Sequence, residues 1–97
     1  MTPEREVELG GRAKDILENE VFGLAHDQIK ERIITEWASS PIRDVEGRER
    51  LFLMLLIHNE HKALIASTME SGKVAAEKIR HNHTMLDRAK DFLKDSW

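Results

Sequence analysis

Apolar residues recur at three- and four-residue steps along much of the chain, which is the spacing of one face of an α-helix. The clearest case runs from Glu20 to Ser39, where charged residues of both signs fill the positions between the apolar ones. Ser39-Ser40-Pro41 ends the pattern, because the residue before a proline is pushed out of the α region. We therefore predict a helix over residues 20–39. Its core-facing stripe is Phe22, Ala25, Ile29, Ile33 and Trp37.

A shorter helix is expected before it. Thr2 can cap the free N–H groups of a helix, and Pro3 is tolerated at the first helical position. Gly10 and Gly11 weaken the pattern, by about 1 kcal/mol each relative to alanine. The helix is therefore expected either to kink at these glycines or to begin only near Arg12. Asn19 is the expected break before the second helix, because it suits both a helix end and a cap.

The third segment is long, and one part of it is apolar on all sides. Asp44 is its best cap, and Ser40 is the alternative. Seven consecutive apolar residues, Leu51–Ile57, cover the whole circumference of a helix. Apolar spacing continues to about residue 80, with Gly72 expected to loosen it, and His81-Asn82-His83-Thr84 is the expected break. The sequence predicts one all-α domain over residues 1–97: an antiparallel helical hairpin over 20–80, a short N-terminal helix and a C-terminal helix over 84–96.

A helix with apolar residues on all sides has to be shielded from water on all sides by other parts of the protein or by a partner. The other predicted helices are short, and two have narrow apolar faces, so a second chain is expected to cover part of the run. The protein is thus expected to form a homo-oligomer, and the alternative is a monomeric bundle with a well-covered core. The predicted interface residues are Leu51, Phe52, Leu53, Leu55, Leu56, Ile57 and Trp97. Trp97, the last residue, is either a loose tail or an anchor on a partner, since Trp is enriched at interface hot spots.

Composition narrows the classes of function. The 97 residues include no Cys, which removes disulfides, zinc–thiolate sites and thiol nucleophiles, and which fits a reducing cytosol. The net charge of −3 disfavours nucleic acid as a partner of the whole surface. The sequence shows neither a signal peptide nor an apolar run of about 18 residues, so no membrane association is expected.

The histidines are the first candidates for chemistry. His58 and His61 lie one helical turn apart and could chelate a metal, but they lack the His-Glu-x-x-His spacing of metalloproteases, and a solvated or hydrogen-bonded pair is expected instead. His81-Asn82-His83 is expected to be a loop. Without Cys or a paired-carboxylate motif, the sequence offers no catalytic constellation. We therefore expect no enzyme, no cofactor and no metal.

Three arginines cluster near the start of the third segment. Arg43, Arg48 and Arg50 could bind a phosphate or nucleotide, because helix N-termini and guanidinium groups both suit anions. They alternate with acidic residues, however, and Glu46–Arg50 has the spacing of a helical ion pair. Internal salt bridging is therefore the expected role, with nucleotide binding as the alternative.

Three segments, residues 12–19, 37–51 and 69–75, together resemble a group of small proteins encoded by tailed phages and prophages of proteobacteria. The centre of the likeness is the Arg-Asp-x-Glu-Gly-Arg-Glu-Arg-Leu block at 43–51. The likeness spans about residues 12–79, and it carries over no functional residue, since the group has no settled activity.

The resemblance implies a phage accessory protein, in the cytoplasm of an infected bacterium or in the virion. The expected function is non-enzymatic: contacts with itself and with another phage or host protein, in particle assembly or packaging. The alternative is a small anti-defence protein that inhibits a host enzyme or sequesters a signalling nucleotide. DNA binding of the small-terminase kind is the third hypothesis.

Overall fold

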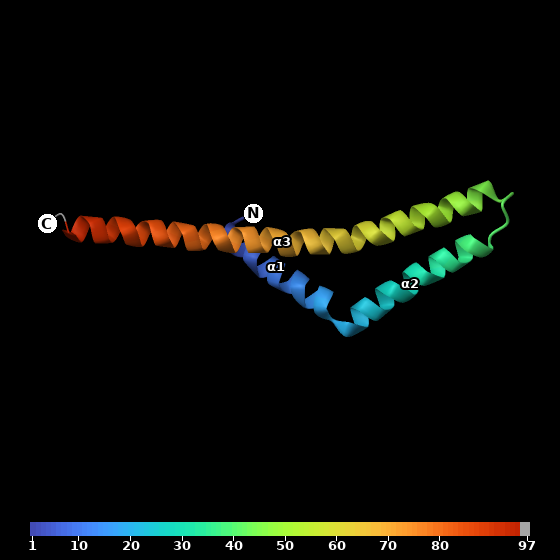
Figure 1. The fold of residues 1–97 in the computed structure, drawn as a ribbon, viewed down its shortest axis with the longest axis horizontal. Helices are drawn as coiled ribbons and strands as arrows, with labels where there is room; N and C mark the ends of the chain where they lie inside the picture. Colours follow the sequence, from blue (N-terminus) through green and yellow to red (C-terminus); the bar gives the residue numbers. More distant parts are fainter. Residues whose placement is uncertain (96–97) are drawn as a thin grey trace.

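Three α-helices make up the fold. The computed structural model describes residues 1–95, and within that range it contains no strand. The helices are α1 (Pro3–Glu18), α2 (Glu20–Ser39) and α3 (Val45–Asp95). Figure 1 shows α1 and α2 as the two arms of an open V, and both arms reach the much longer α3. The predicted all-α class is confirmed.

Side-chain caps set the start of each helix, as the sequence predicts. Thr2 Oγ1 accepts a hydrogen bond from the Arg5 backbone N–H at 3.2 Å. Asn19 Oδ1 accepts one from the Phe22 N–H at 2.9 Å and so separates α1 from α2. Asp44 Oδ1 accepts one from the Gly47 N–H at 3.0 Å. Each of these bonds satisfies a donor that has no partner within its own helix, so the turn points follow from local chemistry.

The predicted break at residues 81–84 is wrong, and so is the separate C-terminal helix. α3 is one helix of 51 residues that passes through this segment. Thr84 does not act as a cap; its hydroxyl instead donates to the Arg80 carbonyl oxygen at 3.0 Å, one turn back in the same helix. His, Asn and Thr are weak helix formers, but each costs at most about 0.7 kcal/mol relative to alanine, which is too little to end a helix.

α1 crosses α3 at close range at Gly10 and Gly72. A Cβ atom added at Gly72 would lie 2.8 Å from the Gly10 Cα, and one added at Gly10 would lie 2.7 Å from the Gly72 Cα. Ala13 and Ala75 are buried one turn further along each helix. The expectation that α1 begins only near Arg12 is wrong, because α1 is one helix from Pro3 to Glu18. At Gly10 the missing side chain allows the backbones of α1 and α3 to approach closely. Gly72 does not interrupt α3.

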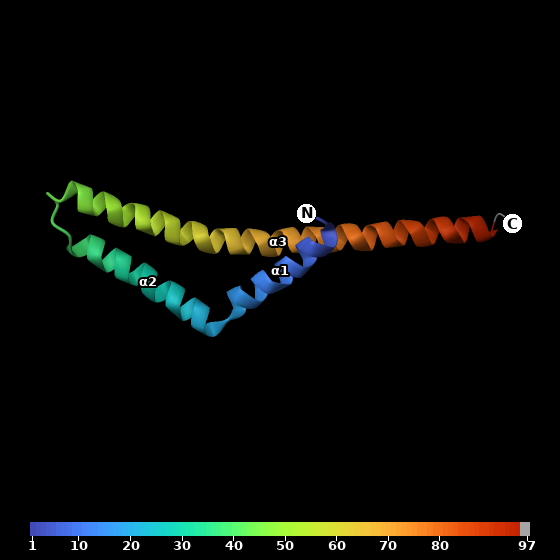
Figure 2. The ribbon, with the colours of Figure 1, turned by 180° about the vertical axis from the view of Figure 1, so that it is seen from behind.

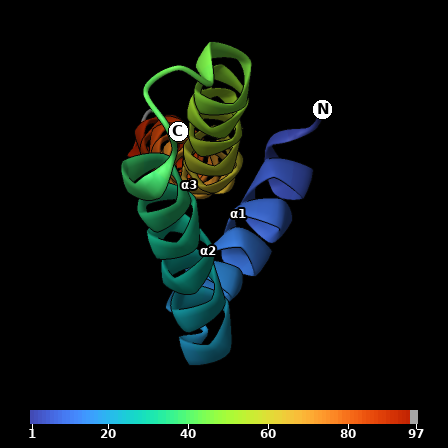
Figure 3. The ribbon, with the colours of Figure 1, turned by 90° about the vertical axis from the view of Figure 1, so that its right-hand side faces the viewer.

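The molecule is elongated, and very little of it is buried. Its extents are 82 × 26 × 17 Å. The radius of gyration is 22.5 Å, whereas a compact chain of this length has about 12.5 Å. Views from behind and along the long axis show that α1 and α2 diverge from their shared vertex and that α3 extends well past α1 (Figures 2 and 3). The buried hydrophobic side chains of the described residues are Ala13, Ile33 and Ala75.

The accessible surface area also shows how little of the chain is buried. The accessible surface is 8122 Å², whereas a compact monomer of 11.2 kDa has about 5,700 Å². The excess is therefore about 2,400 Å². Much of it lies over large apolar side chains, because long stretches of α2 and α3 have no neighbour within this chain.

Candidate interaction surface

An apolar groove lies between α2 and the first turns of α3. α2 contributes Ile33, Ile34 and Trp37 to it, and α3 contributes Leu51, Phe52 and Leu55. The groove has a volume of about 270 Å³. Ile33 is buried at its floor, whereas Ile34, Trp37 and Phe52 are exposed at its edges. The groove is thus already formed in the isolated chain and open to solvent.

The apolar run of α3 is divided between two environments. Leu51 and Leu55 are half-buried and face α2 across the groove. The remaining members of the predicted interface within the run, Phe52, Leu53, Leu56 and Ile57, are exposed, and Ile57 is the most exposed of them at 70%. The chain therefore leaves most of this segment uncovered, as the burial argument from sequence expects. That a second copy covers it stays a prediction. Trp97, the other predicted interface residue, lies outside the described residues.

Trp37 is not a core residue, contrary to the prediction. Its side chain is 43% exposed, and the Arg48 guanidinium lies over its ring, 4.3 Å from the ring centroid. Arg48 Nη1 also donates to the Trp37 carbonyl at 3.2 Å, to the Ser40 carbonyl at 3.3 Å and to Ser40 Oγ at 2.9 Å. Arg48 thereby ties the end of α2 to the first turn of α3 and fixes one wall of the groove.

The three arginines do not form one cluster of free donors. Arg48 is engaged with Ser40 and Trp37, and the Asp44 carboxylate already occupies the N-terminus of α3. Arg43 lies in the connection and Arg50 on α3, both exposed. Within residues 1–95 no ion pair joins Glu46 to Arg50, so that predicted salt bridge is absent there. Of the three arginines, Arg48 has a structural role, through the Trp37 ring and the backbone carbonyls of Trp37 and Ser40.

His58 pairs with a histidine of α2, and not with its neighbour in sequence. The rings of His26 and His58 stack with their centroids 3.8 Å apart. His58 Nε2 lies 2.8 Å from the His26 carbonyl oxygen, and His26 Nε2 lies 3.4 Å from the His58 carbonyl oxygen. Since a carbonyl only accepts, each Nε2 carries a hydrogen and donates it. His61 is exposed, and no cluster of metal-ligating side chains occurs among the described residues.

Replacing His58 by alanine tests this pairing. We expect the free energy of unfolding to fall by about 1–2 kcal/mol, because the change removes the ring that stacks on the buried His26 side chain and leaves the His26 carbonyl oxygen without its donor, His58 Nε2. The matched control is His61→Ala, one turn further along the same helix, which should change it by less than about 0.5 kcal/mol. Urea unfolding of both variants at one protein concentration measures the difference. If His58→Ala and His61→Ala had equal free energies of unfolding, the stacked histidines would contribute nothing to stability.

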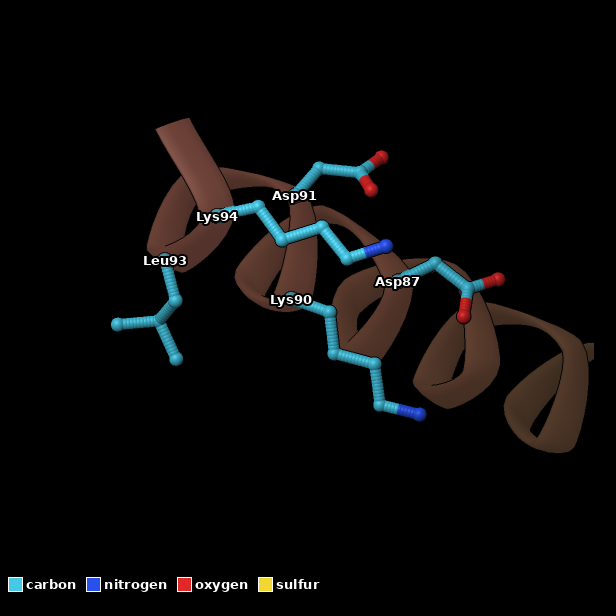
Figure 4. A pocket seen from close by; sticks show the side chains of 5 residues that line it. All are labelled: Asp87, Lys90, Asp91, Leu93 and Lys94. Atoms are coloured by element: carbon cyan, nitrogen blue, oxygen red, sulfur yellow. The ribbon is translucent and has the colours of Figure 1, made fainter. Parts of the chain in front are cut away.

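A shallow hollow near the end of α3 offers no ligand site. Its lining residues are Asp87, Lys90, Asp91, Leu93 and Lys94. All five belong to neighbouring turns of the same helix, and Figure 4 shows their side chains spreading away from it. No second element of the described chain faces them, so nothing converges on a bound group.

Comparison of the chain with protein-family models, with curated proteins and with solved structures finds no match. Among the described residues, no helix has the length and apolar character needed to cross a membrane. The groove and the uncovered apolar side chains beside it on α2 and α3 are the main surface features of the described residues.

Proposed function

We propose that the protein acts without catalysis, through contacts with copies of itself and with another protein. In this proposal α2 and the first half of α3 work as an antiparallel hairpin that presents the groove and the exposed apolar residues beside it. The observation that carries the proposal is that Phe52, Leu53, Leu56 and Ile57, four apolar residues in two helical turns, are left in water by their own chain. Full burial of such a side chain is worth about 1.5–3 kcal/mol, and covering the part that is still exposed recovers the corresponding share of it, so the four together favour a protein partner.

The proposed partner and place of action follow from the resemblance to phage proteins. We propose that the partner is a component of a phage particle or of its packaging machinery, and that the chain acts in the infected bacterial cytoplasm or in the virion. The geometry of the three arginines gives no particular support to nucleotide sequestration, since Arg48 is already occupied by Trp37 and Ser40. The net charge of −3 does not favour DNA binding.

A complementation experiment in the encoding phage tests the proposal. The gene is deleted and supplied in trans as the unchanged chain, as Phe52→Asp or as Asn59→Asp, an exposed α3 position outside the groove. We expect Phe52→Asp to lower the yield of infectious particles at least tenfold, because it places a charge at the edge of the groove. Asn59→Asp should support a normal yield. Full particle yield with Phe52→Asp, or with no chain at all, would contradict a role in assembly.

A further inference from the structure

α3 carries a second apolar feature that is separate from the groove. A path of positions spaced alternately by four and three residues runs along a single face of α3. Its members are Leu53, Ile57, Glu60, Leu64, Ser67, Ser71, Val74, Lys78, His81 and Met85. Every residue on this path is exposed. Its apolar members are Leu53, Ile57, Leu64, Val74 and Met85. We call this path the α3 seam; its 3.5-residue period is that of a helix that pairs with another helix.

The middle of the α3 seam is built differently from its ends. Ser67 and Ser71 lie at its centre, where their small side chains would let a second backbone approach closely. Glu60 and Lys78 flank them, one on each side and at nearly equal distances along the helix. Neither makes an ion pair within residues 1–95. The α3 seam thus carries opposite charges at mirrored positions.

We infer that two copies of this chain pair through the α3 seam, with their α3 helices antiparallel and centred on each other at residue 69. In this register Leu64 lies opposite Val74, and Leu53 lies opposite Met85. Glu60 lies opposite Lys78 of the second copy, and the same pair recurs by symmetry, as an isologous interface requires. Leu53 and Leu64 thus meet apolar residues and Glu60 meets the opposite charge, whereas Ile57 lies opposite His81 of the second copy.

A parallel pairing of the same helices places like charges together. Glu60 would then lie opposite Glu60, and Lys78 opposite Lys78, and such pairs disfavour association. The area also fits a second copy. A standard interface buries about 800 Å² on each partner, well within the excess of about 2,400 Å² that this chain exposes over a compact monomer. The remaining excess includes the groove, which the pairing leaves open for another protein.

The inference rests on the proposed function, because it names one of the partners as a second copy. Cysteine cross-linking tests it cleanly, since the chain has no cysteine of its own. Leu64→Cys and Val74→Cys are prepared as separate proteins with different tags, then mixed and oxidised. In the antiparallel register a Leu64→Cys chain meets a Val74→Cys chain within the 4.4–6.8 Å that a disulfide allows between Cα atoms.

Each variant alone should cross-link poorly, because the two copies of one position then lie about 10 residues apart along the helix, or about 15 Å. The expected result is therefore a disulfide dimer in the mixture at least tenfold more abundant than in either protein alone. Cross-linking of each variant with itself would show a parallel pairing and overturn the register. An oligomer with no mixed disulfide would overturn this pairing but leave the proposed function standing, whereas a chain that stays monomeric would contradict both.

Charge reversal gives a second readout that does not depend on disulfide geometry. Glu60→Lys and Lys78→Glu should each raise the dimer dissociation constant about tenfold, since each turns two attractive pairs into repulsive ones. The double variant should restore it to within about threefold of the starting value, because the pairs are then attractive again. Glu31→Lys, an exposed position on α2, should leave the constant unchanged. Weakening in the double variant equal to the combined effects of the single changes would overturn the proposed contact between Glu60 and Lys78.

Discussion

Replacement of Gly72 by alanine is expected to lower the free energy of unfolding by about 2 kcal/mol and to loosen α1 from α3. The added Cβ would lie 2.8 Å from the Gly10 Cα and 3.0 Å from the Glu6 carbonyl oxygen. Both neighbours are backbone atoms, which cannot rotate away as a side chain can, so the two helices have to separate. Urea unfolding followed by circular dichroism measures the stability, and hydrogen exchange of the α1 amides measures the loosening.

Two other glycines supply matched controls. A Cβ added at Gly11 or at Gly23 has nothing within 4 Å. Alanine at either position should therefore raise the free energy of unfolding by about 0.4–1 kcal/mol, because alanine is the better helix former and restricts the unfolded chain. All variants are compared at one protein concentration, since association would itself add to stability. If Gly72→Ala were as stable as Gly11→Ala, the close crossing of α1 and α3 would be disproved.

Replacement of Ile57 by aspartate is expected to weaken self-association by about 100-fold or more, because a buried isoleucine is worth about 1.5–3 kcal/mol in each copy. In an isolated chain the same change should cost little, since the Ile57 side chain is 70% exposed there. The contrast is what makes the variant informative: a large effect appears only if a second chain covers Ile57. Light scattering across a dilution series measures the dissociation constant, and circular dichroism confirms that the helices are intact.

Asn59→Asp is the control for that variant, because it introduces the same carboxylate two residues further along α3, off the α3 seam. It should leave the dissociation constant within about threefold of the original, as expected for an exposed surface change. Equal dissociation constants for Ile57→Asp and the unchanged chain would show that Ile57 takes no part in the contact.

Local chemistry explains which parts of the fold can be predicted from the sequence. Thr2, Asn19 and Asp44 each cap a helix with their own side chain, so the turn points depend on neighbours within three residues. The exposed apolar run was also predictable, because seven consecutive apolar residues surround a helix whatever packs against it. Three short helical segments cannot cover all sides of such a run, and the structure leaves most of it exposed.

Contacts between residues far apart in the chain escaped prediction. Propensity counts Gly10 and Gly72 as weak points, yet 62 positions separate them in sequence and they meet at the crossing of α1 and α3. The similar spacing of Gly10 with Ala13 and of Gly72 with Ala75 was a signal of close helix packing. His26 was missed as the partner of His58 for the same reason. The break expected near His81 failed because weak propensities do not stop a helix that is already formed.

The mass of the unchanged chain in solution tests the central claim most directly. Light scattering on the purified protein at tens of micromolar should give at least twice 11.2 kDa, because the chain by itself leaves too much apolar surface in water. A mass of 11.2 kDa, together with a fully helical circular dichroism spectrum, would show that the exposed faces of α2 and α3 are stable without a second copy and would contradict the claim.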